Sequence, residues 1–167
     1  MKAHEVVHGT FAIERTYEAP PDRVFAAWAD PELKARWFVG PDGWKPVRRE
    51  LDFRPGGSEL LHGTFDNGRE TLFVARYHDI VQDERIVYVY DMQLAQKPHS
   101  VSLATVELKP QGVGTRLVFT EQVAFLDGTD GPSSRERGTS THLDRLDAVV
   151  RWSCASSVNL QSKGARQ

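Results

Sequence analysis

The sequence predicts an α+β fold in which a curved antiparallel sheet of seven strands surrounds one long C-terminal helix. Three observations lead to this fold class: a strand pattern followed by two short helices, six further strand patterns joined by short turns, and one amphipathic helix near the C-terminus. No crossover helix separates the six strand patterns, which argues against a parallel sheet.

The first strand is expected at residues 10–19. Phe11, Ile13 and Tyr17 alternate there with Glu and Thr side chains. Strict alternation of this kind is typical of a strand that buries one face and exposes the other.

Two short helices are expected next. Residues 20–22 (Pro-Pro-Asp) end the strand and begin the first helix, because proline fits a first helical turn and an aspartate there caps the helix or complements its dipole. The second helix begins after Asp30-Pro31, with Leu33, Arg36 and Trp37 on one face.

Six further strands are predicted between residues 45 and 125, at a spacing of roughly ten residues that is typical of an antiparallel meander. They are expected at residues 45–54, 57–66, 70–81, 85–94, 100–109 and 114–125. The turns between them are expected at residues 55–57, 66–68, 82–84, 97–98 and 112–114, where Gly, Pro, Asn and Asp gather.

The last element is a helix expected from about residue 134 to 152. Ser133 and Glu136 form the pattern of a capping box, with Ser133 as the N-cap. Apolar residues then repeat at intervals of three and four: Leu143, Leu146, Val149 and Val150. A sheet of seven strands cannot leave both faces in water, and only this helix is long enough to cover one of them. We therefore expect a strongly curved sheet around the helix, with a cavity between the two.

Composition limits the function classes. The 167 residues are enough for one core, and we expect a single domain at residues 10–153 with flexible termini at 1–9 and 154–167. A net charge of −2 argues against nucleic acid or an anionic membrane as a partner. The N-terminus lacks the apolar stretch of a secretory signal, so a cytoplasmic location is expected. The single cysteine, Cys154, excludes an internal disulfide and is interpreted as an incidental thiol.

Several motifs resemble the START-like (SRPBCC) superfamily, and within it the branch of activator of heat-shock-protein ATPase homologues. The motifs are RTYEAPPDRVFAAW at 15–28, DPEL at 30–33, RW at 36–37, DFRPGG at 52–57, ERIVY at 84–88, GTRL at 114–117 and LDRL at 143–146. They occur in the family's order over residues 10 to 152. The resemblance implies the helix-grip fold of START domains and birch-pollen allergens.

The resemblance implies function less closely than fold. The family contains ligand carriers, polyketide cyclases, co-chaperone-like modules and members without an assigned role. Its members often carry Gly-Trp early in the last helix, with the tryptophan facing the pocket. This chain has Gly138-Thr139 at the corresponding positions, which predicts a larger or more polar pocket.

Glu121 is the most informative single residue. It shares a strand face with Leu117, Phe119, Val123 and Phe125, and a carboxylate on an apolar face is costly unless it is paired or protonated. It is interpreted either as a pocket acid or as a structural residue, which pairs with an inward arginine or is turned outward by a break in the register. His62, His78 and His142 lack the spacing of metal ligands, and no metal or cofactor is expected.

The leading hypothesis is that the cavity binds a small apolar or amphipathic molecule without catalysis, in a monomer or homodimer. The tyrosines 77, 88 and 90 are expected to be core residues or to present their hydroxyls to a ligand, and Phe38 and Trp44 flank a loop that could gate the pocket. The residues expected to line the cavity are Trp37, Phe73, Tyr88, Tyr90, Phe119, Glu121, Thr139, His142, Leu143 and Leu146. The alternatives are a cyclase- or hydrolase-type enzyme that uses Glu121 with a histidine, and a co-chaperone-like interaction module.

Overall fold

The structure is a computed structural model that describes residues 3–129 and 131–163, with side chains described as far as residue 151. Seven strands and three helices follow one another in the predicted order. The strands are β1 (Val7–Tyr17), β2 (Trp44–Leu51), β3 (Ser58–Phe65), β4 (Glu70–Val81), β5 (Arg85–Leu94), β6 (Lys97–Gln111) and β7 (Gly114–Phe125). The helices are α1 (Pro21–Ala29), α2 (Pro31–Trp37) and α3 (Pro132–Lys163).

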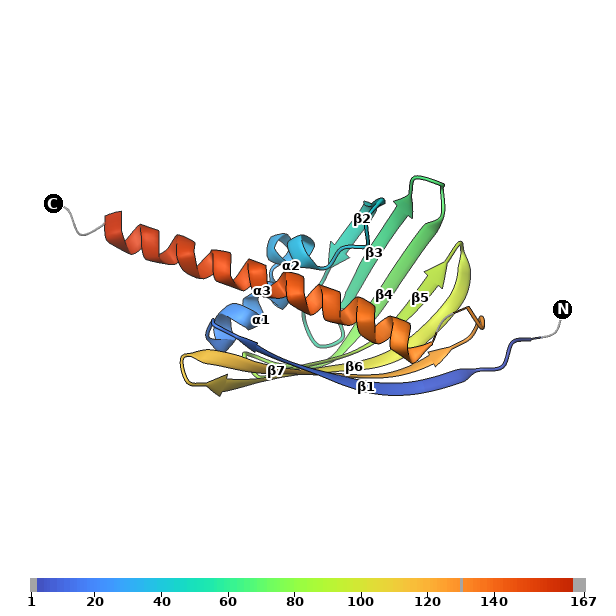
Figure 1. Ribbon diagram of the computed structural model, residues 1–167, viewed down its shortest axis with the longest axis horizontal. Coiled ribbons are helices and arrows are strands. Elements are labelled where there is room, and N and C mark those ends of the chain that lie inside the picture. Colours follow the sequence, from blue (N-terminus) through green and yellow to red (C-terminus); the bar gives the residue numbers. More distant parts are fainter. Residues whose placement is uncertain (1–2, 130, 164–167) are drawn as a thin grey trace.

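The strands form one antiparallel sheet in the order β1-β7-β6-β5-β4-β3-β2. Consecutive strands from β2 to β7 pair as a meander, and β1 joins the far edge beside β7. The sheet curves around α3, and α1 and α2 lie beside that helix (Figure 1). The predicted helix-grip fold is confirmed.

The residues of β7 that were predicted to share the apolar face are buried. Leu117, Phe119, Val123 and Phe125 are buried on the face toward α3, and Glu121 is buried among them with no exposed surface. The stripe predicted on α3 meets this face, since Leu143, Leu146 and Val150 are also buried. One continuous apolar core therefore joins the sheet to the helix.

The turn between β5 and β6 lies two residues before the predicted position, and a bulge in β6 follows it. The turn lies at Ala95 and Gln96, whose φ angles of 50° and 65° give the left-handed pair that a two-residue hairpin requires. Pro98 is already in the strand, and the register shifts between Met92 and Gln93, so that His99 is the extra residue of the bulge. As a result His99 and the neighbouring Ser100 are both buried.

The helices differ from the sequence expectation in which residues they bury. In α2 the buried residues are Lys34 and Trp37, whereas Arg36, predicted to share a face with Trp37, is exposed. Asp30 caps α2, because its carboxylate accepts the backbone N–H groups of Glu32 and Leu33 at 2.8 and 3.3 Å. In α1, Pro20 is the N-cap and its side chain makes no capping bond.

The bounds of α3 also differ from the prediction. The helix begins at Pro132, so Ser133 lies inside the first turn and is not the N-cap. It continues to Lys163 because residues 153–163 contain neither glycine nor proline. The segments predicted to be flexible therefore overlap α3 at one end and β1 at the other, while residues 164–167 and the Cys154 side chain lie outside the described part. Within the described part, no helix is long and apolar enough to cross a membrane.

Candidate functional site

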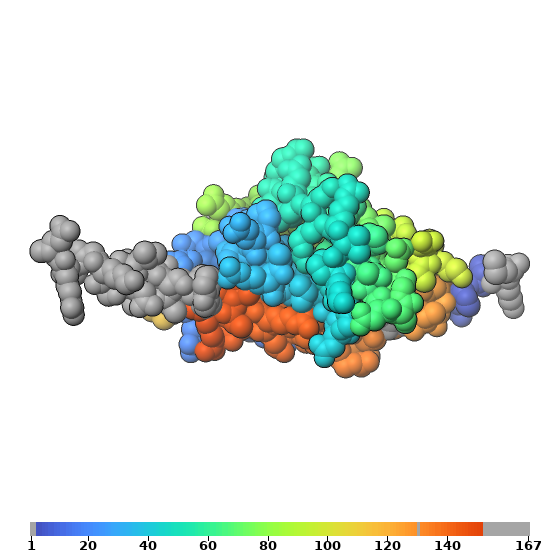
Figure 2. Space-filling view, turned by 90° about the horizontal axis from the view of Figure 1, so that it is seen from above, coloured from blue at the N-terminus to red at the C-terminus, as the bar shows by residue number. Residues whose placement is uncertain are grey.

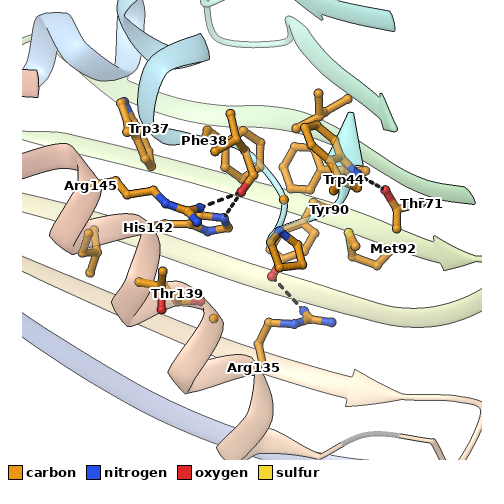
Figure 3. Close-up of a pocket in the computed structure, with 18 of the residues that line it drawn as sticks. Trp37, Phe38, Trp44, Thr71, Tyr90, Met92, Arg135, Thr139, His142 and Arg145 are labelled. Atoms are coloured by element: carbon orange, nitrogen blue, oxygen red, sulfur yellow. Dashed lines mark hydrogen bonds between the residues drawn. The ribbon is translucent and has the colours of Figure 1, made fainter. Parts of the chain in front are cut away.

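A cavity of about 440 Å³ lies between the concave face of the sheet, α3 and the segment that joins α2 to β2 (Figure 3). This volume falls in the range of sites that bind small molecules. Seen from above, α1 and α2 pack against α3 (Figure 2).

Aromatic rings form one continuous part of the cavity wall. The Phe38 ring lies 4.9 Å from that of Phe73, which lies 4.8 Å from that of Tyr90, and the Tyr88 ring lies 5.9 Å from that of Tyr90. Phe73 lies on β4, and Tyr88 and Tyr90 lie at alternate positions of β5, where period-two geometry points them inward, whereas Phe38 follows α2. The aromatic part of the wall therefore belongs largely to the sheet.

Trp44 closes the wall at the start of β2. Its indole lies against Gly63, where a Cβ atom would come within 2.0 Å of the ring, so only glycine fits opposite it. The indole N–H donates to the Thr71 hydroxyl at 2.8 Å. Trp37 is fixed in a similar way, since its N–H donates to the Ala27 carbonyl at 2.8 Å.

Most of the residues predicted to line the cavity do so. Trp37, Phe73, Tyr88, Tyr90, Phe119, Thr139, His142 and Leu143 are in its wall. Glu121 and Leu146 are not: both have no exposed surface and lie behind the wall, within the core. Whether any of these residues contacts a ligand remains a prediction.

Glu121 belongs to a group that we call the α3 cluster: Arg135, Tyr90 and Glu121. The Tyr90 hydroxyl donates to Glu121 Oε1, while Arg135 Nη1 lies 3.9 Å from Glu121 Oε2 and donates to the Tyr90 hydroxyl at 2.8 Å. Oε2 has no hydrogen-bond partner among the described residues. Burial raises the pKa of Glu121, and Arg135, Tyr90 and Ser102 oppose that rise. Of the two interpretations offered by the sequence, the structure therefore shows pairing with an inward arginine.

A second group, the α2 cluster, also combines a cation, a carboxylate and a tyrosine: Lys34, Glu59 and Tyr77. Lys34 Nζ lies 2.5 Å from Glu59 Oε1 and donates to the Tyr77 hydroxyl at 3.2 Å, and that hydroxyl donates to Glu59 at 2.8 Å. The Lys34 and Glu59 side chains are only 4% and 3% exposed. Burial lowers the pKa of Lys34 and raises that of Tyr77, so the ion pair stands against a large desolvation cost.

His142 connects α3 to the segment after α2. Its Nε2 atom lies 2.9 Å from the Val39 carbonyl oxygen, which also accepts Arg145 Nη1 at 3.0 Å (Figure 3). Since a carbonyl only accepts, Nε2 carries the proton. Burial lowers the pKa of His142 to about 4, so the ring is neutral at pH 7. A neutral histidine held in one orientation contributes shape and polarity to the wall.

His99 contributes a further polar group, from the bulge in β6. Its Nδ1 atom lies 2.8 Å from Asp127 Oδ2. Burial raises the pKa of Asp127, but hydrogen bonds from His99 and Thr129 outweigh it and bring the pKa to about 2. The other two histidines named from the sequence lie elsewhere: His62 faces Glu70 at 3.5 Å outside this cavity, and His78 is exposed.

The described residues contain no group of three His, Cys, Asp or Glu side chains placed to hold a metal ion. Glu121 instead bonds to Tyr90 and lies near Arg135, while His142 bonds to the Val39 carbonyl and His99 to Asp127.

Sequence reasoning missed several polar residues of the wall, among them Lys34, His99, Arg135 and Arg145. A signal for two of them was present. Thr139 and His142 were expected on the cavity face of the last helix, and steps of four back and three forward reach Arg135 and Arg145. No comparable signal marked His99, because its inward position depends on the bulge.

Comparison with known proteins agrees with this architecture. Residues 18–151 match the family described as Activator of Hsp90 ATPase homolog 1-like protein. An uncharacterised protein from Rhizobium leguminosarum is 41% identical, with a TM-score of 0.83 over 88% of this chain and 97% of that one. The Mll3558 protein from Rhizobium loti is 48% identical, with a TM-score of 0.81 over 87% and 99%.

More distant structures share the fold alone. An AHSA1-like protein from Aeromonas hydrophila is 20% identical, with a TM-score of 0.66 over 87% of this chain and 94% of that one. No match was found among curated proteins. The family match spans most of the chain, and the two Rhizobium proteins align over nearly their whole length. This chain therefore belongs to the Activator of Hsp90 ATPase homolog 1-like family.

Proposed function

We propose that the protein binds a small apolar or amphipathic molecule in the cavity between the sheet and α3. The observation that carries this proposal is a cavity of about 440 Å³ whose wall is mainly apolar, rich in aromatic rings, and contains a few fixed polar groups. Aromatic walls supply affinity through burial of apolar surface, and a small number of oriented polar groups supplies selectivity.

Small residues on α3 support the proposal because they leave room. Gly138 and Thr139 are in the wall, and a Cβ atom added to Gly138 would meet no atom within 4 Å. Glycine inside a helix costs about 1 kcal/mol relative to alanine. A large side chain at either position would occupy space that the protein leaves open.

The co-chaperone alternative receives less support from the surface. Docking to another protein usually uses a contiguous exposed apolar patch. Among the described residues, two large apolar side chains are more than half exposed: Val113, at 93%, and Val47, at 58%. The other exposed ones are less than half exposed; Leu103, for example, is 38% exposed. The cavity is the more developed feature.

Binding of the neutral fluorophore N-phenyl-1-naphthylamine tests the proposal. The fluorophore should gain intensity with the wild-type protein, and Thr139→Trp should abolish the gain because an indole at this position fills the cavity. Arg137→Trp is the matched control, since Arg137 lies two residues away on α3, is exposed and is not in the wall.

Circular dichroism should show that both tryptophan variants remain folded. Equal binding by Thr139→Trp and wild type would place the fluorophore outside the cavity. Absence of binding by the wild type, to this probe and to a panel of lipids and aromatic compounds, would overturn the proposal.

A further inference from the structure

We infer that the ligand carries an anionic group, and that Arg135 binds this group while the aromatic wall receives the apolar body. The inference rests on the proposed function, because it names the class of molecule that the cavity takes. Its starting point is the charge of the wall. Among the described residues that line the cavity, Lys34, Arg69, Arg135 and Arg145 are basic and none is Asp or Glu.

The carboxylates that pair with these cations lie behind the wall. Glu59 pairs with Lys34, and Glu121 lies 3.9 Å from Arg135, but neither carboxylate lines the cavity. Each pair therefore turns its positive end toward the empty space. Because charges interact more strongly beside low-dielectric apolar walls than in bulk water, such an orientation favours a negative charge inside the cavity.

Arg135 has two N–H donors to spare, whereas Lys34, with three donors and bonds to Glu59 and Tyr77, has one. A guanidinium has five N–H donors. Arg135 uses Nη1 for the Tyr90 and Ser102 hydroxyls, at 2.8 and 3.3 Å, and Nη2 for the Ser100 hydroxyl at 2.7 Å. The N–H group at Nε and one N–H at Nη2 have no hydrogen-bond partner among the described residues. A free pair of N–H groups on one guanidinium is suited to a carboxylate, which accepts both.

The guanidinium is also held in place before any ligand arrives. Three hydroxyls fix it against the sheet, and its Cζ atom lies 5.2 Å from the centre of the Phe125 ring and 5.7 Å from that of Tyr90. The Arg135 side chain is 13% exposed, so it is mostly shielded and still reachable. A charged donor that is already ordered loses little entropy on binding.

Arg145 is the other arginine of α3 in the wall, and it is less pre-organised, because one hydrogen bond among the described residues holds its guanidinium against three for Arg135. It donates to the Val39 carbonyl, and this bond ties it to the segment between α2 and β2. Arg69 is exposed, so water screens its charge. These differences single out Arg135 as the residue that sets the ligand's charge.

Two probes of equal shape test the inference: 2-naphthoate, which is anionic at pH 7, and 2-naphthamide, which is neutral. Each is titrated against the wild-type protein loaded with N-phenyl-1-naphthylamine, and its dissociation constant is measured from displacement. The acid should bind about tenfold or more tightly than the amide, since hydrogen bonds to charged groups are the strong ones. Arg135→Gln should bring the two constants within about twofold of each other.

Matched variants locate the effect. Arg137→Gln removes an exposed positive charge two residues away and should keep the wild-type preference. Arg145→Gln should keep most of it. Arg135→Lys retains the charge but loses the fork, and should keep only part of the preference. Thermal melts are recorded for each variant, and the comparison within wild type holds even where a variant unfolds.

The outcomes separate the two proposals. Equal binding of acid and amide by the wild type, with the neutral fluorophore still bound, would overturn the anionic ligand and leave the cavity's function intact. Loss of the preference in Arg145→Gln, with its retention in Arg135→Gln, would overturn the assignment to Arg135. Failure of the fluorophore itself to bind would instead count against the proposed function.

Discussion

The α2 cluster and the α3 cluster are built from the same three kinds of group: a cation, a carboxylate and a tyrosine hydroxyl. In the α2 cluster, Lys34, Glu59 and Tyr77 bond to one another in a closed triangle. In the α3 cluster, Glu121 Oε2 has no hydrogen bond among the described residues, and Arg135 keeps N–H groups without a partner there.

The difference shows that burial of a charge has two distinct consequences in one cavity. A cluster that satisfies its own groups fixes the position of one element against another, in this case α2 against β3 and β4. A cluster that leaves donors unsatisfied retains the capacity to bind something else. The residue types do not distinguish the α2 cluster from the α3 cluster, but the hydrogen bonds within each cluster do.

The largest expected effect comes from breaking the α2 cluster. Glu59→Gln leaves the buried Lys34 ammonium without its counter-ion and should lower the free energy of unfolding by about 3–5 kcal/mol. Urea denaturation measures the change. As a control, Glu50→Gln breaks the exposed Arg48–Glu50 ion pair and should cost less than about 1 kcal/mol. Equal losses in the two variants would mean that the α2 cluster is not a structural lock.

The next effect concerns His142, whose ring packs 5.3 Å from Phe38 beside the α2 cluster. Burial holds the pKa of His142 at about 4, below its ordinary value of 6.5, so the unfolded chain binds a proton that the folded chain does not. Stability from this group is present above pH 6.5 and is lost as the pH falls toward 4, by ~3 kcal/mol in total.

His142→Gln removes this titration and keeps a donor for the Val39 carbonyl. The free energy of unfolding of the variant, measured by urea denaturation from pH 7 to pH 4, should fall less steeply than that of the wild type. If the free energies of unfolding of the variant and the wild type fell in parallel, the pKa of His142 would not be lowered in the folded protein.

The smallest effect is expected in the α3 cluster. Glu121→Gln keeps an acceptor for the Tyr90 hydroxyl and removes a carboxylate whose pKa is raised by burial, so the free energy of unfolding should change by about 1 kcal/mol or less at pH 7. A raised pKa means that the stability this carboxyl contributes is lost as the pH rises above 4.5, its ordinary value, toward the pKa in the folded protein, so the variant should gain relative to the wild type as the pH rises above 4.5. If Glu121→Gln lowered the free energy of unfolding as much as Glu59→Gln does, the α3 cluster would be a structural lock like the α2 cluster.

The sequence carried most of the fold and part of the site. Alternation in β7 identified Glu121 as a buried carboxylate, because period-two geometry depends only on neighbours along the chain. It did not identify Arg135, whose contact with Glu121 forms only when α3 docks on the sheet. Lys34 was missed for a similar reason: a lysine in a short helix is ordinarily placed in water, and its burial depends on Glu59 from a distant strand.

The hydrogen bonds to the Val39 carbonyl suggest how fast the proposed ligand would enter and leave. It receives both His142 and Arg145, and the neighbouring Phe38 carbonyl accepts Arg49 Nη2 from β2 at 2.8 Å. Two successive peptide groups thus fasten the segment that borders the cavity to α3 on one side and to the sheet on the other. If the proposed ligand enters past this segment, these hydrogen bonds must break together, and they would then govern its residence time more than its affinity.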